Sequence, residues 1–416
     1  MSVLHLVYNF GIRIYGLGIR IASFFHPKAR LAIQGRSEVF TLLRAWKKSN
    51  PSETPIAWFH CASLGEFEQG RPLIEALRAE RPDVKIVLTF FSPSGYEVRK
   101  KYAGADLVLY LPFDYPSHAA QWVSELQPTQ AVFVKYEYWP NFFLALSKHH
   151  IPLFIVSGIF REGHRFFGWQ RTFWKKILGC VTTFHLQNER SARLLATLGF
   201  TNSIVAGDTR FDRVLQIATE AKVLPIADTF CGDHPVLIAG SSYDAEEEIV
   251  QSFMYGCPQN WKAIVVPHEI DEAHIQSILL RFGNDAITWS AWTPAMAKKR
   301  VLVVDQMGLL SALFRYGRIA LIGGGFGKGL HNTLEAAVYG IPVAFGPRYH
   351  KFDEACALLA GEGGFSADDK SVMTQHLLLW AGNEELRHKT GQKAAELVAS
   401  GKGAVAVALE ILLNKL

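Results

Sequence analysis

The sequence predicts an α/β protein with two doubly wound parallel sheets, and three observations lead to that class. From residue 55 onward, short and almost continuously apolar runs alternate with segments of helical length. Runs of this kind are typical of strands covered on both faces, as in parallel sheets. The alternation breaks once, in a polar stretch near residues 208–233, and then restarts. Repeated strand–helix–strand units on both sides of a break indicate two α/β domains.

The apolar runs give the expected strands in chain order. In the first half we expect strands at 56–61, 84–90, 106–111, 131–136, 153–158, 182–187 and 203–207. In the second half we expect strands at 236–240, 262–267, 286–289, 300–305, 318–325 and 342–345. With the boundary near 208–215, one domain covers 31–212 and a second covers 213–416. Ligands bind at the carboxyl ends of the strands in such sheets, so we expect the binding site in a deep cleft between the domains.

Length and composition are those of an ordinary folded protein. The chain has 416 residues, enough for two or three domains with cores of their own. Apolar residues make up 49% and charged residues 19%, which excludes an intrinsically disordered chain. The five cysteines never approach CxxC spacing, which indicates reduced thiols in a cytosolic setting.

Residues 1–30 are set apart by charge and amphipathicity. The first 50 residues hold eight Lys or Arg and one Glu, in a chain whose net charge is only +5. Polar or small residues recur at helical spacing on one face of the first 25 positions, namely Asn9, Arg13, Gly16 and Arg20, and nearly all others are apolar. No arginine-free stretch here is long enough to cross about 30 Å of hydrocarbon.

This pattern favours a helix that lies in a membrane surface. Lys28, Arg30 and Arg36 are then expected to contact anionic lipid headgroups. The alternative is a helix that docks on the rest of the protein. Nucleic acid is not expected as a partner, because basic and aromatic residues do not alternate as a stacking platform requires.

Glu66 is the first candidate for chemistry. It follows the predicted strand IAWFHC in the turn HCASLGE, where a helix begins. A carboxylate at a strand's carboxyl end can act as a general base toward a substrate hydroxyl. The alternative is a first-turn Glu that is favoured by the helix dipole. A serine hydrolase is not expected, since the elbow GxSxG needs glycine where Cys61 stands.

The second candidate is the glycine-rich stretch GGGFGKGLHNTLEAA at 323–337. Glycine amides next to a helix N-terminus can bind an anion, and Asn332 and Glu335 lie in the first turn, where a carboxylate can hold a ribose diol. The stretch matches neither the Walker A pattern nor GxGxxG, which excludes those two phosphate-binding motifs. A plain structural turn is the alternative.

The third candidate is KYEYWP at 135–140, at the end of a predicted strand. Period-two spacing is expected to point Lys135 and Glu137 the same way, either for function or as a salt bridge. The 15 histidines never give HExxH or a paired-carboxylate cage, so no metal and no cofactor are predicted.

Taken together, these stretches resemble the family of 3-deoxy-D-manno-octulosonic acid (Kdo) transferases. The similar segments occur in order along nearly the whole chain: HCASLGE, KYEYWP, HLQNERSARLLATLGF, GDTRFD, GSSYDAEEE, VPHE, VDQMGLLSALFRYGRIALIGGGF and HNTLEAAVYGIPVAFGP, after the N-terminal helix. The resemblance implies two Rossmann-like domains, the GT-B fold, and a lipopolysaccharide inner-core enzyme. It further implies CMP-Kdo as donor, a lipid A precursor (lipid IVA) as acceptor, and a monotopic location on the cytoplasmic face of a Gram-negative inner membrane.

The resemblance also assigns roles to residues. It implies that Glu66 is the general base of an inverting, metal-independent transfer, and that Glu137 and Arg210 stabilise the transition state. It implies a donor site formed by Ser241, Pro267, His268, Met307, Gly308, Leu309, Gly324, Gly325, Asn332, Thr333, Leu334 and Glu335.

Four positions depart from the pattern that is usual in the family. His268 stands in place of an arginine, and Leu309 in place of a glutamate. Arg210 replaces the usual lysine and keeps its charge. SGIFREG lacks the arginine expected near Ile159, and Arg161 lies close by.

Two other functions are compatible with parts of the pattern. One is a different GT-B nucleotide-sugar enzyme, a transferase or an epimerase with another donor. The other is an inactive, membrane-associated module that binds a sugar nucleotide. The N-terminal helix and the ASLGE turn disfavour a soluble epimerase, and a base at Glu66 disfavours the inactive module.

Overall fold

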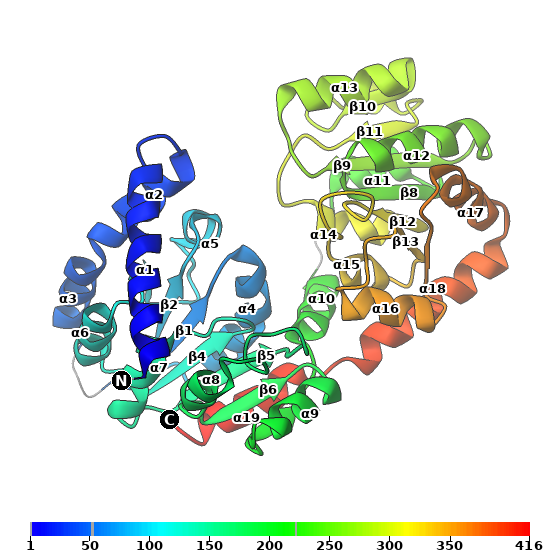
Figure 1. Cartoon of the computed structure of the whole chain (residues 1–416). Helices are drawn as coiled ribbons and strands as arrows, with labels where there is room; N and C mark the ends of the chain where they lie inside the picture. Colours follow the sequence, from blue (N-terminus) through cyan, green and yellow to red (C-terminus); the bar gives the residue numbers. More distant parts are fainter. Residues whose placement is uncertain (1, 51–53, 221–222) are drawn as a thin grey trace. The chain divides into compact units, whose positions relative to one another are not determined.

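The computed structural model describes residues 2–50, 54–220 and 223–416, which form two compact units (Figure 1). Unit 1 comprises Met1–Arg213 and Gly403–Leu416, and unit 2 comprises Val214–Lys402. Each unit is built around one sheet of seven parallel strands. The predicted α/β class with two parallel sheets is therefore confirmed.

The sheet of unit 1 has the order β3-β2-β1-β4-β5-β6-β7. Its strands are β1 (Ile56–Cys61), β2 (Lys85–Phe90), β3 (Leu107–Tyr110), β4 (Gln130–Val134), β5 (Leu153–Gly158), β6 (Thr183–Leu186) and β7 (Ser203–Val205). Strand β1 pairs with β2 on one side and with β4 on the other, so the strand order reverses beside it. In open α/β sheets this reversal is where ligands bind.

Helices cover both faces of this sheet. They are α1 (Val3–Ala22), α2 (Pro27–Ser37), α3 (Val39–Ser49), α4 (Leu64–Glu80), α5 (Pro93–Arg99), α6 (Pro116–Leu126), α7 (Pro140–Lys148), α8 (Arg171–Leu178), α9 (Glu189–Thr197) and α19 (Ala404–Leu413). Helix α10 (Thr209–Glu220) begins in unit 1, and its residues from Val214 onward belong to unit 2. Successive β1 side chains enter different cores, because strand side chains alternate between faces. Trp58 packs in the core of α6 and α7, whereas Phe59 packs in the core of α4 and α19.

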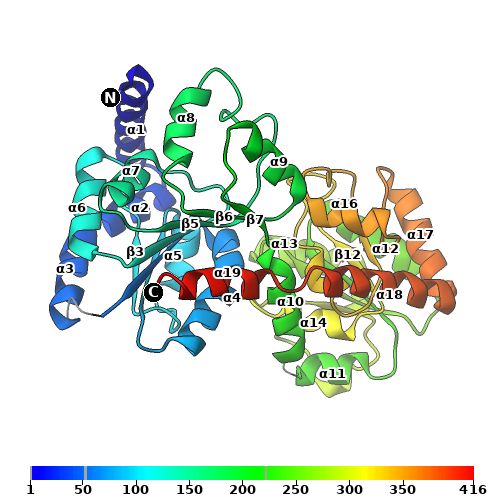
Figure 2. The same cartoon turned by 90° about the horizontal axis from the view of Figure 1, so that it is seen from below.

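The last helix of the chain belongs to unit 1, whereas the predicted second domain extended to residue 416. Helix α19 lies along α4 (Figure 2), and Ala408 and Leu412 are buried in the α4 core. The carboxylate of Asp212 accepts hydrogen bonds from the amides of Gly403 (2.8 Å) and Val405 (3.1 Å). It thereby satisfies amides at the start of α19 that have no partner within the helix.

The sheet of unit 2 has the order β10-β11-β9-β8-β12-β13-β14. Its strands are β8 (Val236–Ser242), β9 (Lys262–Pro267), β10 (Ala286–Thr288), β11 (Val301–Val303), β12 (Ile319–Ile322), β13 (Val343–Phe345) and β14 (Gly364–Ser366). The order reverses beside β8, which pairs with β9 and with β12. Strand β14 was not predicted, because it is three half-buried residues that begin with glycine.

The helices of unit 2 are short on average. They are α11 (Pro225–Cys231), α12 (Asp244–Gly256), α13 (Glu272–Phe282), α14 (Leu310–Leu313), α15 (Leu334–Ala337), α16 (Asp353–Ala360), α17 (Lys370–Gly382) and α18 (Glu384–Ser400), with 3₁₀ turns η1 (Gly283–Asp285), η2 (Pro294–Met296) and η3 (Phe314–Tyr316). Phe253, Ile278 and Leu377 bury the inner faces of α12, α13 and α17 in one core.

One face of α1 docks on unit 1 through polar side chains. His5 Nε2 lies 2.9 Å from Asn141 Oδ1, and the Asn141 amide donates to Asn9 Oδ1 at 2.8 Å. The Tyr8 hydroxyl donates to the buried carboxylate of Asp114 at 2.7 Å. The predicted polar face of the helix therefore includes contacts with the protein itself.

The other face of α1 is apolar and exposed. Its large side chains, from 46% to 75% exposed, are Val3, Leu6, Val7, Phe10, Ile14, Tyr15, Leu17 and Ile21, and Phe24 and Phe25 follow at 72% and 85%. Among the described residues, no helix is both long enough and apolar enough to span a bilayer. Docking and an exposed apolar surface therefore coexist on one helix.

The expectation for Arg36 is wrong. Its guanidinium donates to the carbonyls of Leu111 (2.9 Å), Phe91 (2.6 Å) and Ala32 (3.1 Å). It also lies 4.6 Å from the ring centre of Phe91 and 4.7 Å from that of Phe113. Arg36 thus anchors α2 inside unit 1, because its fork of donors matches carbonyls left unpaired at strand ends.

Candidate active site

Glu66 lies in the first turn of α4, where β1 ends at the reversal of the unit 1 sheet. Ser63 is the N-cap of this helix and accepts a hydrogen bond from the Gly65 amide at 3.2 Å. The Ser63 hydroxyl in turn donates to the Glu66 carboxylate. The turn after β1 therefore holds a half-buried carboxylate in a fixed position beside the sheet edge.

Glu137 follows β4, the strand next to β1. The strand ends at Val134, and Lys135 has φ of 68°, so the expected period-two alternation of Lys135 and Glu137 is wrong. A left-handed residue breaks that alternation and is uncommon outside glycine. The Glu137 carboxylate accepts a hydrogen bond from Trp139 Nε1 at 2.7 Å and lies 3.3 Å from His60 Nε2.

A buried series of hydrogen-bonded side chains lies behind Glu137 and was not predicted from the sequence. The Trp58 indole donates to Thr89 Oγ1 at 2.9 Å, and Thr89 Oγ1 lies 2.9 Å from His60 Nδ1. The Thr89 hydroxyl donates to the Phe59 carbonyl at 3.3 Å. Because a carboxylate only accepts hydrogen bonds, the contact between His60 Nε2 and Glu137 requires the proton on Nε2. The available signal was a histidine inside an otherwise apolar strand, since a buried imidazole needs partners.

Both carboxylates act on the pKa of the buried Cys61 thiol. Burial raises its pKa well above the ordinary value, and the negative charges of Glu66 and Glu137 raise it further. The thiol therefore stays protonated, and a Cys61 nucleophile is excluded. Both charges act on one side chain at the end of β1, as expected for residues at neighbouring strand ends.

Arg210 forms an ion pair with a buried carboxylate. Its Nε and a terminal nitrogen lie 2.8 Å and 2.7 Å from Asp208 Oδ2, and its amide donates to Asp208 Oδ1 at 2.9 Å. Burial acts to raise the pKa of Asp208, but the charge and hydrogen bonds of Arg210 outweigh it, and the pKa falls below its usual value. Asp208 is thus ionised and holds Arg210 in one orientation.

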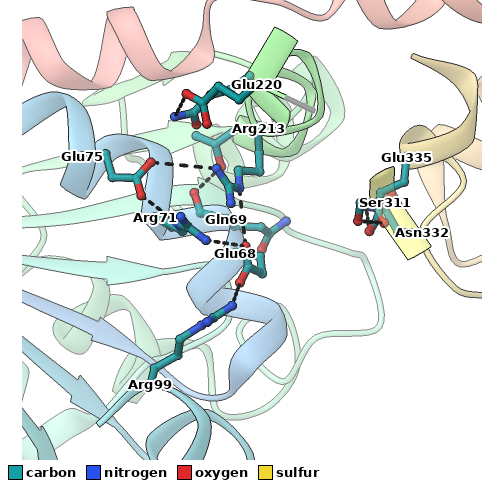
Figure 3. A network of polar contacts seen from close by, with 12 residues as sticks. Glu68, Gln69, Arg71, Glu75, Arg99, Arg213, Glu220, Ser311, Asn332 and Glu335 are labelled. Atoms are coloured by element: carbon teal, nitrogen blue, oxygen red, sulfur yellow. Dashed lines mark hydrogen bonds and ion pairs between the residues drawn. The ribbon is translucent and has the colours of Figure 1, made fainter. Parts of the chain in front are cut away.

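Ion pairs fix the outer face of α4, as Figure 3 shows. Arg71 lies 2.7 Å from Glu75, and Arg99 lies 2.8 Å from Glu68. Arg213, from the start of α10, contacts Glu68 at 3.4 Å and Glu75 at 3.8 Å. The helix that carries Glu66 is therefore tied to both α5 and α10.

The glycine-rich turn lies at the reversal of the unit 2 sheet, between the ends of β12 and β8. A Cβ atom on Gly323 would lie 1.9 Å from the Ser241 carbonyl oxygen, and Ser241 itself has φ of 52°. The Gly323 amide donates to the Gly240 carbonyl at 2.9 Å, and the Gly324 amide to the buried Glu246 at 2.9 Å. Close packing thus requires glycine here, and two of its amides donate within the protein.

Two imidazoles and a phenol stack beside this turn. The ring centres of His268 and His331 are 4.5 Å apart, and that of Tyr243 is 5.1 Å from His268. His268 directly follows Pro267, the last residue of β9. Burial, and then the nearby His268, lower the pKa of His331 to about 4. His331 is accordingly neutral near pH 7.

Asn332 and Glu335 are brought together. The Asn332 amide donates to Glu335 Oε1 at 3.1 Å, its oxygen accepts from the Leu334 amide at 3.1 Å, and the Ser311 hydroxyl donates to Glu335 Oε2 (Figure 3). Thr333 and Leu334 are buried. The remaining predicted donor residues, Met307, Gly308 and Leu309, form a turn between β11 and α14, where Met307 is 80% exposed and Gly308 has φ of 85°.

One group of side chains in unit 2 has the composition of a cation site. Asp244, Glu247 and His274 each offer a ligand atom, all within 4.8 Å of one another. His274 Nε2 lies 3.0 Å from Glu247, and Asp244 lies 3.7 Å from Arg281. Glu247 and Asp244 thus already have partners within the protein. The sequence expectation of no metal stays a prediction.

Comparison with known proteins agrees with this architecture. Residues 34–213 match the family model described as 3-Deoxy-D-manno-octulosonic-acid transferase (kdotransferase). The 3-deoxy-D-manno-octulosonic acid transferase of Haemophilus influenzae is 26% identical over 85% of this chain and 86% of its own length. The enzyme of that name from Bordetella pertussis is 25% identical over 98% of both chains.

Solved structures show the same fold. UDP-GlcNAc 2-epimerase from Neisseria meningitidis, bound to UDP-GlcNAc, superposes with a TM-score of 0.64 at 15% identity, over 86% of this chain and all of that one. CalG4, the calicheamicin glycosyltransferase, superposes with a TM-score of 0.53 at 12% identity, over 87% of this chain and 98% of that one. The two doubly wound units thus define a protein of the GT-B-like class. Within that class, the chain is similar to 3-deoxy-D-manno-octulosonic acid transferases over most of its length, which bears out the resemblance of its motifs and the prediction of a glycosyltransferase.

Proposed function

We propose that this protein transfers Kdo from CMP-Kdo to a lipid A precursor of the lipid IVA type, in lipopolysaccharide inner-core synthesis. The observation that carries the proposal is the placement of Glu66 and Glu137 at neighbouring strand ends, where the unit 1 sheet reverses. Ligands bind at such positions in α/β sheets. The names of the relatives supply the sugar.

In the proposed reaction, Glu66 takes the proton from the acceptor's primary hydroxyl. That oxygen forms a bond to the anomeric carbon of Kdo while the bond from this carbon to the CMP phosphate breaks. The configuration inverts, CMP leaves with the electron pair, and Glu66 passes its proton to solvent. Positioned carboxylates contribute about 10²–10⁴-fold in such steps. Glu137 and Arg210 serve to stabilise the transition state, each held by a partner that fixes its orientation, His60 and Asp208 respectively.

The proposed donor site lies in unit 2. In this proposal Glu335 binds the ribose diol, supported by its hydrogen bonds with Asn332 and Ser311, with Thr333 and Leu334 as the buried base of the turn. His268, His331 and Tyr243 offer aromatic ring faces and also hydrogen-bond donors, and the latter suit the anionic groups of CMP-Kdo. The remaining predicted contacts are Ser241, Pro267, the turn at Met307, Gly308 and Leu309, and Gly324 with Gly325. Gly324 contributes shape more than hydrogen bonding, because its amide already donates to Glu246.

The exposed face of α1 supports a monotopic location on the cytoplasmic face of the inner membrane. A row of large apolar side chains on a helix with Arg13 and Arg20 suits an anionic lipid surface. The exposed Lys28 and Arg30 extend the positive charge beyond its end. The membrane would then bring the lipid acceptor to the unit that carries Glu66.

The transfer is tested by incubating the full chain with lipid IVA and CMP-Kdo generated in situ, in EDTA, with products read by mass spectrometry. We expect a mass gain of one or more Kdo units. Glu66→Gln should lower turnover by about 10²–10⁴-fold. Glu80→Gln, at the exposed far end of the same helix, is the matched control and should leave it unchanged. Intact CMP-Kdo and an unmodified acceptor with the wild-type protein would refute the proposal and favour another donor.

The membrane contact is tested by flotation with vesicles that contain anionic lipid. Phe10→Ser with Phe25→Ser removes two of the most exposed rings and should lower vesicle binding at least about tenfold, since burying one Phe side chain contributes about 1.5–3 kcal/mol. Leu280→Ser, 82% exposed on α13, is the matched control and should bind as the wild type does. Equal binding by the double variant would show that α1 does not contact the membrane.

A further inference from the structure

A pocket of about 760 Å³ lies in unit 1 beside α1. Helix α1, the turn after β4, the loop at 161–166 and helix α8 form its walls. Its volume falls within the ~300–1,000 Å³ that is usual for small-molecule sites. Glu137 lies in its lining, so the pocket opens onto one of the two carboxylates at the sheet edge.

Fixed aromatic rings line much of the pocket. The Trp139 ring stacks on Phe91, with centres 4.8 Å apart, while its indole nitrogen donates to Glu137. Phe166 packs edge-on against Trp174 at 4.9 Å and Tyr138 at 5.0 Å. The C–H faces of a pyranose ring are apolar and pack well on such rings, while its hydroxyls suit a carboxylate acceptor. The walls therefore fit a sugar better than a purely apolar chain.

Two arginines add positive charge to the same pocket. Arg161, His164 and Arg165 come from one loop, and the Arg165 guanidinium lies 5.5 Å from the Trp174 ring centre. Burial, and then the charges of Arg161 and Arg165, lower the pKa of His164, so both guanidiniums act at one place. Glu162, the acidic residue of this loop, forms an ion pair with Arg190 at 3.1 Å. Paired guanidiniums match the oxygens of a phosphate.

The position of α1 indicates what kind of molecule carries this sugar. Tyr8 and Ile12 on one side of the helix line the pocket, whereas Phe10 and Ile14 on the other side are 68% and 54% exposed. A ligand whose tail stays in a lipid surface can therefore reach the pocket with its head. Such a ligand is an amphiphile with a phosphorylated sugar head.

We infer that this pocket binds the phosphorylated sugar head of the glycolipid acceptor, with Arg161 and Arg165 on its phosphate and the sugar against Trp139 and Phe166. The inference rests on the proposed function and adds to it a residue-level reason for acceptor choice. The two arginines are specificity determinants, and they do not take part in proton transfer.

The test compares two acceptors in neutral phosphatidylcholine vesicles, so that the acceptor carries the only phosphomonoester. One acceptor is the phosphorylated lipid A precursor, and the other is the same glycolipid after phosphatase treatment. For the wild type we expect kcat/KM at least about tenfold lower on the dephosphorylated acceptor. In the variant Arg161→Gln with Arg165→Gln, kcat/KM on the phosphorylated acceptor should fall by the same factor, so that the two acceptors are used equally well. The KM for CMP-Kdo should stay unchanged. Arg193→Gln, exposed on α9, is the matched control.

Full discrimination by the double variant would overturn the inference, because the phosphate would then be bound elsewhere. If the wild type transfers no sugar at all, the proposed function fails, and equilibrium binding of the two glycolipids in neutral micelles decides on the pocket. A preference for the phosphorylated glycolipid that the double variant loses supports the pocket, whereas equal binding by both proteins refutes it. Thermal melts of each variant verify that it is folded.

Discussion

The carboxyl edge of β1 and β4 in unit 1 and that of β8 and β12 in unit 2 occupy equivalent places in two sheets, yet their side chains differ in kind. The unit 1 edge carries carboxylates with partners that fix them, Glu66 with Ser63 and Glu137 with His60. The unit 2 edge carries close-packed glycines, stacked imidazoles and one carboxylate held by an amide. The same fold thus presents carboxylates held by partners in one unit, and a glycine-rich turn with aromatic rings in the other.

The difference teaches how duplicated architecture can divide one reaction. A base must be held where a hydroxyl approaches, which requires directional partners around a charge. A nucleotide must be recognised by shape and by several weak contacts, which suits a turn that follows a short strand. The first two predictions below each disturb one of these two arrangements.

Among the residues that hold a site side chain in position, the largest effect is expected for the buried hydrogen-bonded side chains behind Glu137. His60→Gln should lower kcat by about 10–100-fold, because a hydrogen bond to a charged group contributes about 1.5–3 kcal/mol. The donor KM should stay unchanged, since His60 lies in unit 1 and acts only through Glu137. In a Glu137→Gln background the same change should add little, which a double-mutant cycle measures. His185→Gln, also buried in the unit 1 sheet, is the control, and fully additive losses would refute the positioning role.

A smaller effect is expected at the unit 2 edge. Asn332→Ala removes the amide that holds Glu335 and should raise the donor KM about 2–10-fold, with little change in kcat. The reason is that a typical intramolecular hydrogen bond contributes a net ~0.5–1.5 kcal/mol, and the Ser311 hydroxyl still holds the other oxygen of Glu335 in the variant. Steady-state kinetics at saturating acceptor separates the two constants. Asn284→Ala, exposed on η1, is the control, and a fall in kcat alone would contradict the binding role.

The third prediction concerns the stability of the fold against acid and not the activity. Burial lowers the pKa of His185 to about 4, from an ordinary 6.5, and neither ring nitrogen has a hydrogen-bond partner among the described residues. As the pH falls below 6.5, the His185 side chain takes up a proton in the unfolded chain but not in folded unit 1. The free energy of unfolding therefore falls, by about 2 kcal/mol at pH 5. His185→Leu should flatten this loss in denaturant melts between pH 7 and pH 5. An unchanged slope would place the acid sensitivity elsewhere, His331 of unit 2 being the next candidate because its pKa is lowered in the same direction.

Much of the fold could be predicted because parallel strands are nearly continuous apolar runs. The expected strands at 56–61, 153–158 and 262–267 match β1, β5 and β9 residue for residue. Strand β14 gave no such signal, since it is short and half-buried. The return of α19 to unit 1 involves the hydrogen bond from the Gly403 amide to Asp212. These residues are far apart in the sequence, so no local pattern encodes their contact.

The site was predictable where it follows strand ends and unpredictable where it depends on side-chain partners. Glu66 and Glu137 follow β1 and β4, so a strand pattern locates them. The fixing partners His60 and Asp208 lie in a buried strand and in a loop, and neither stands out without three-dimensional contacts. Arg36 looked like a lipid ligand from its charge alone, whereas it donates to buried carbonyls.

The division of labour between the two edges is tested most directly by measuring CMP binding and turnover together in two variants. Calorimetry gives the CMP affinity, and mass spectrometry gives the rate of Kdo transfer. We expect Glu66→Gln to keep its CMP affinity and lose turnover by about 10²–10⁴-fold. Glu335→Gln should weaken CMP binding about tenfold and keep most of its kcat at saturating donor. If Glu66→Gln lost CMP binding, or if Glu335→Gln bound CMP normally but could not turn over, the assignment of chemistry to unit 1 and donor binding to unit 2 would be wrong.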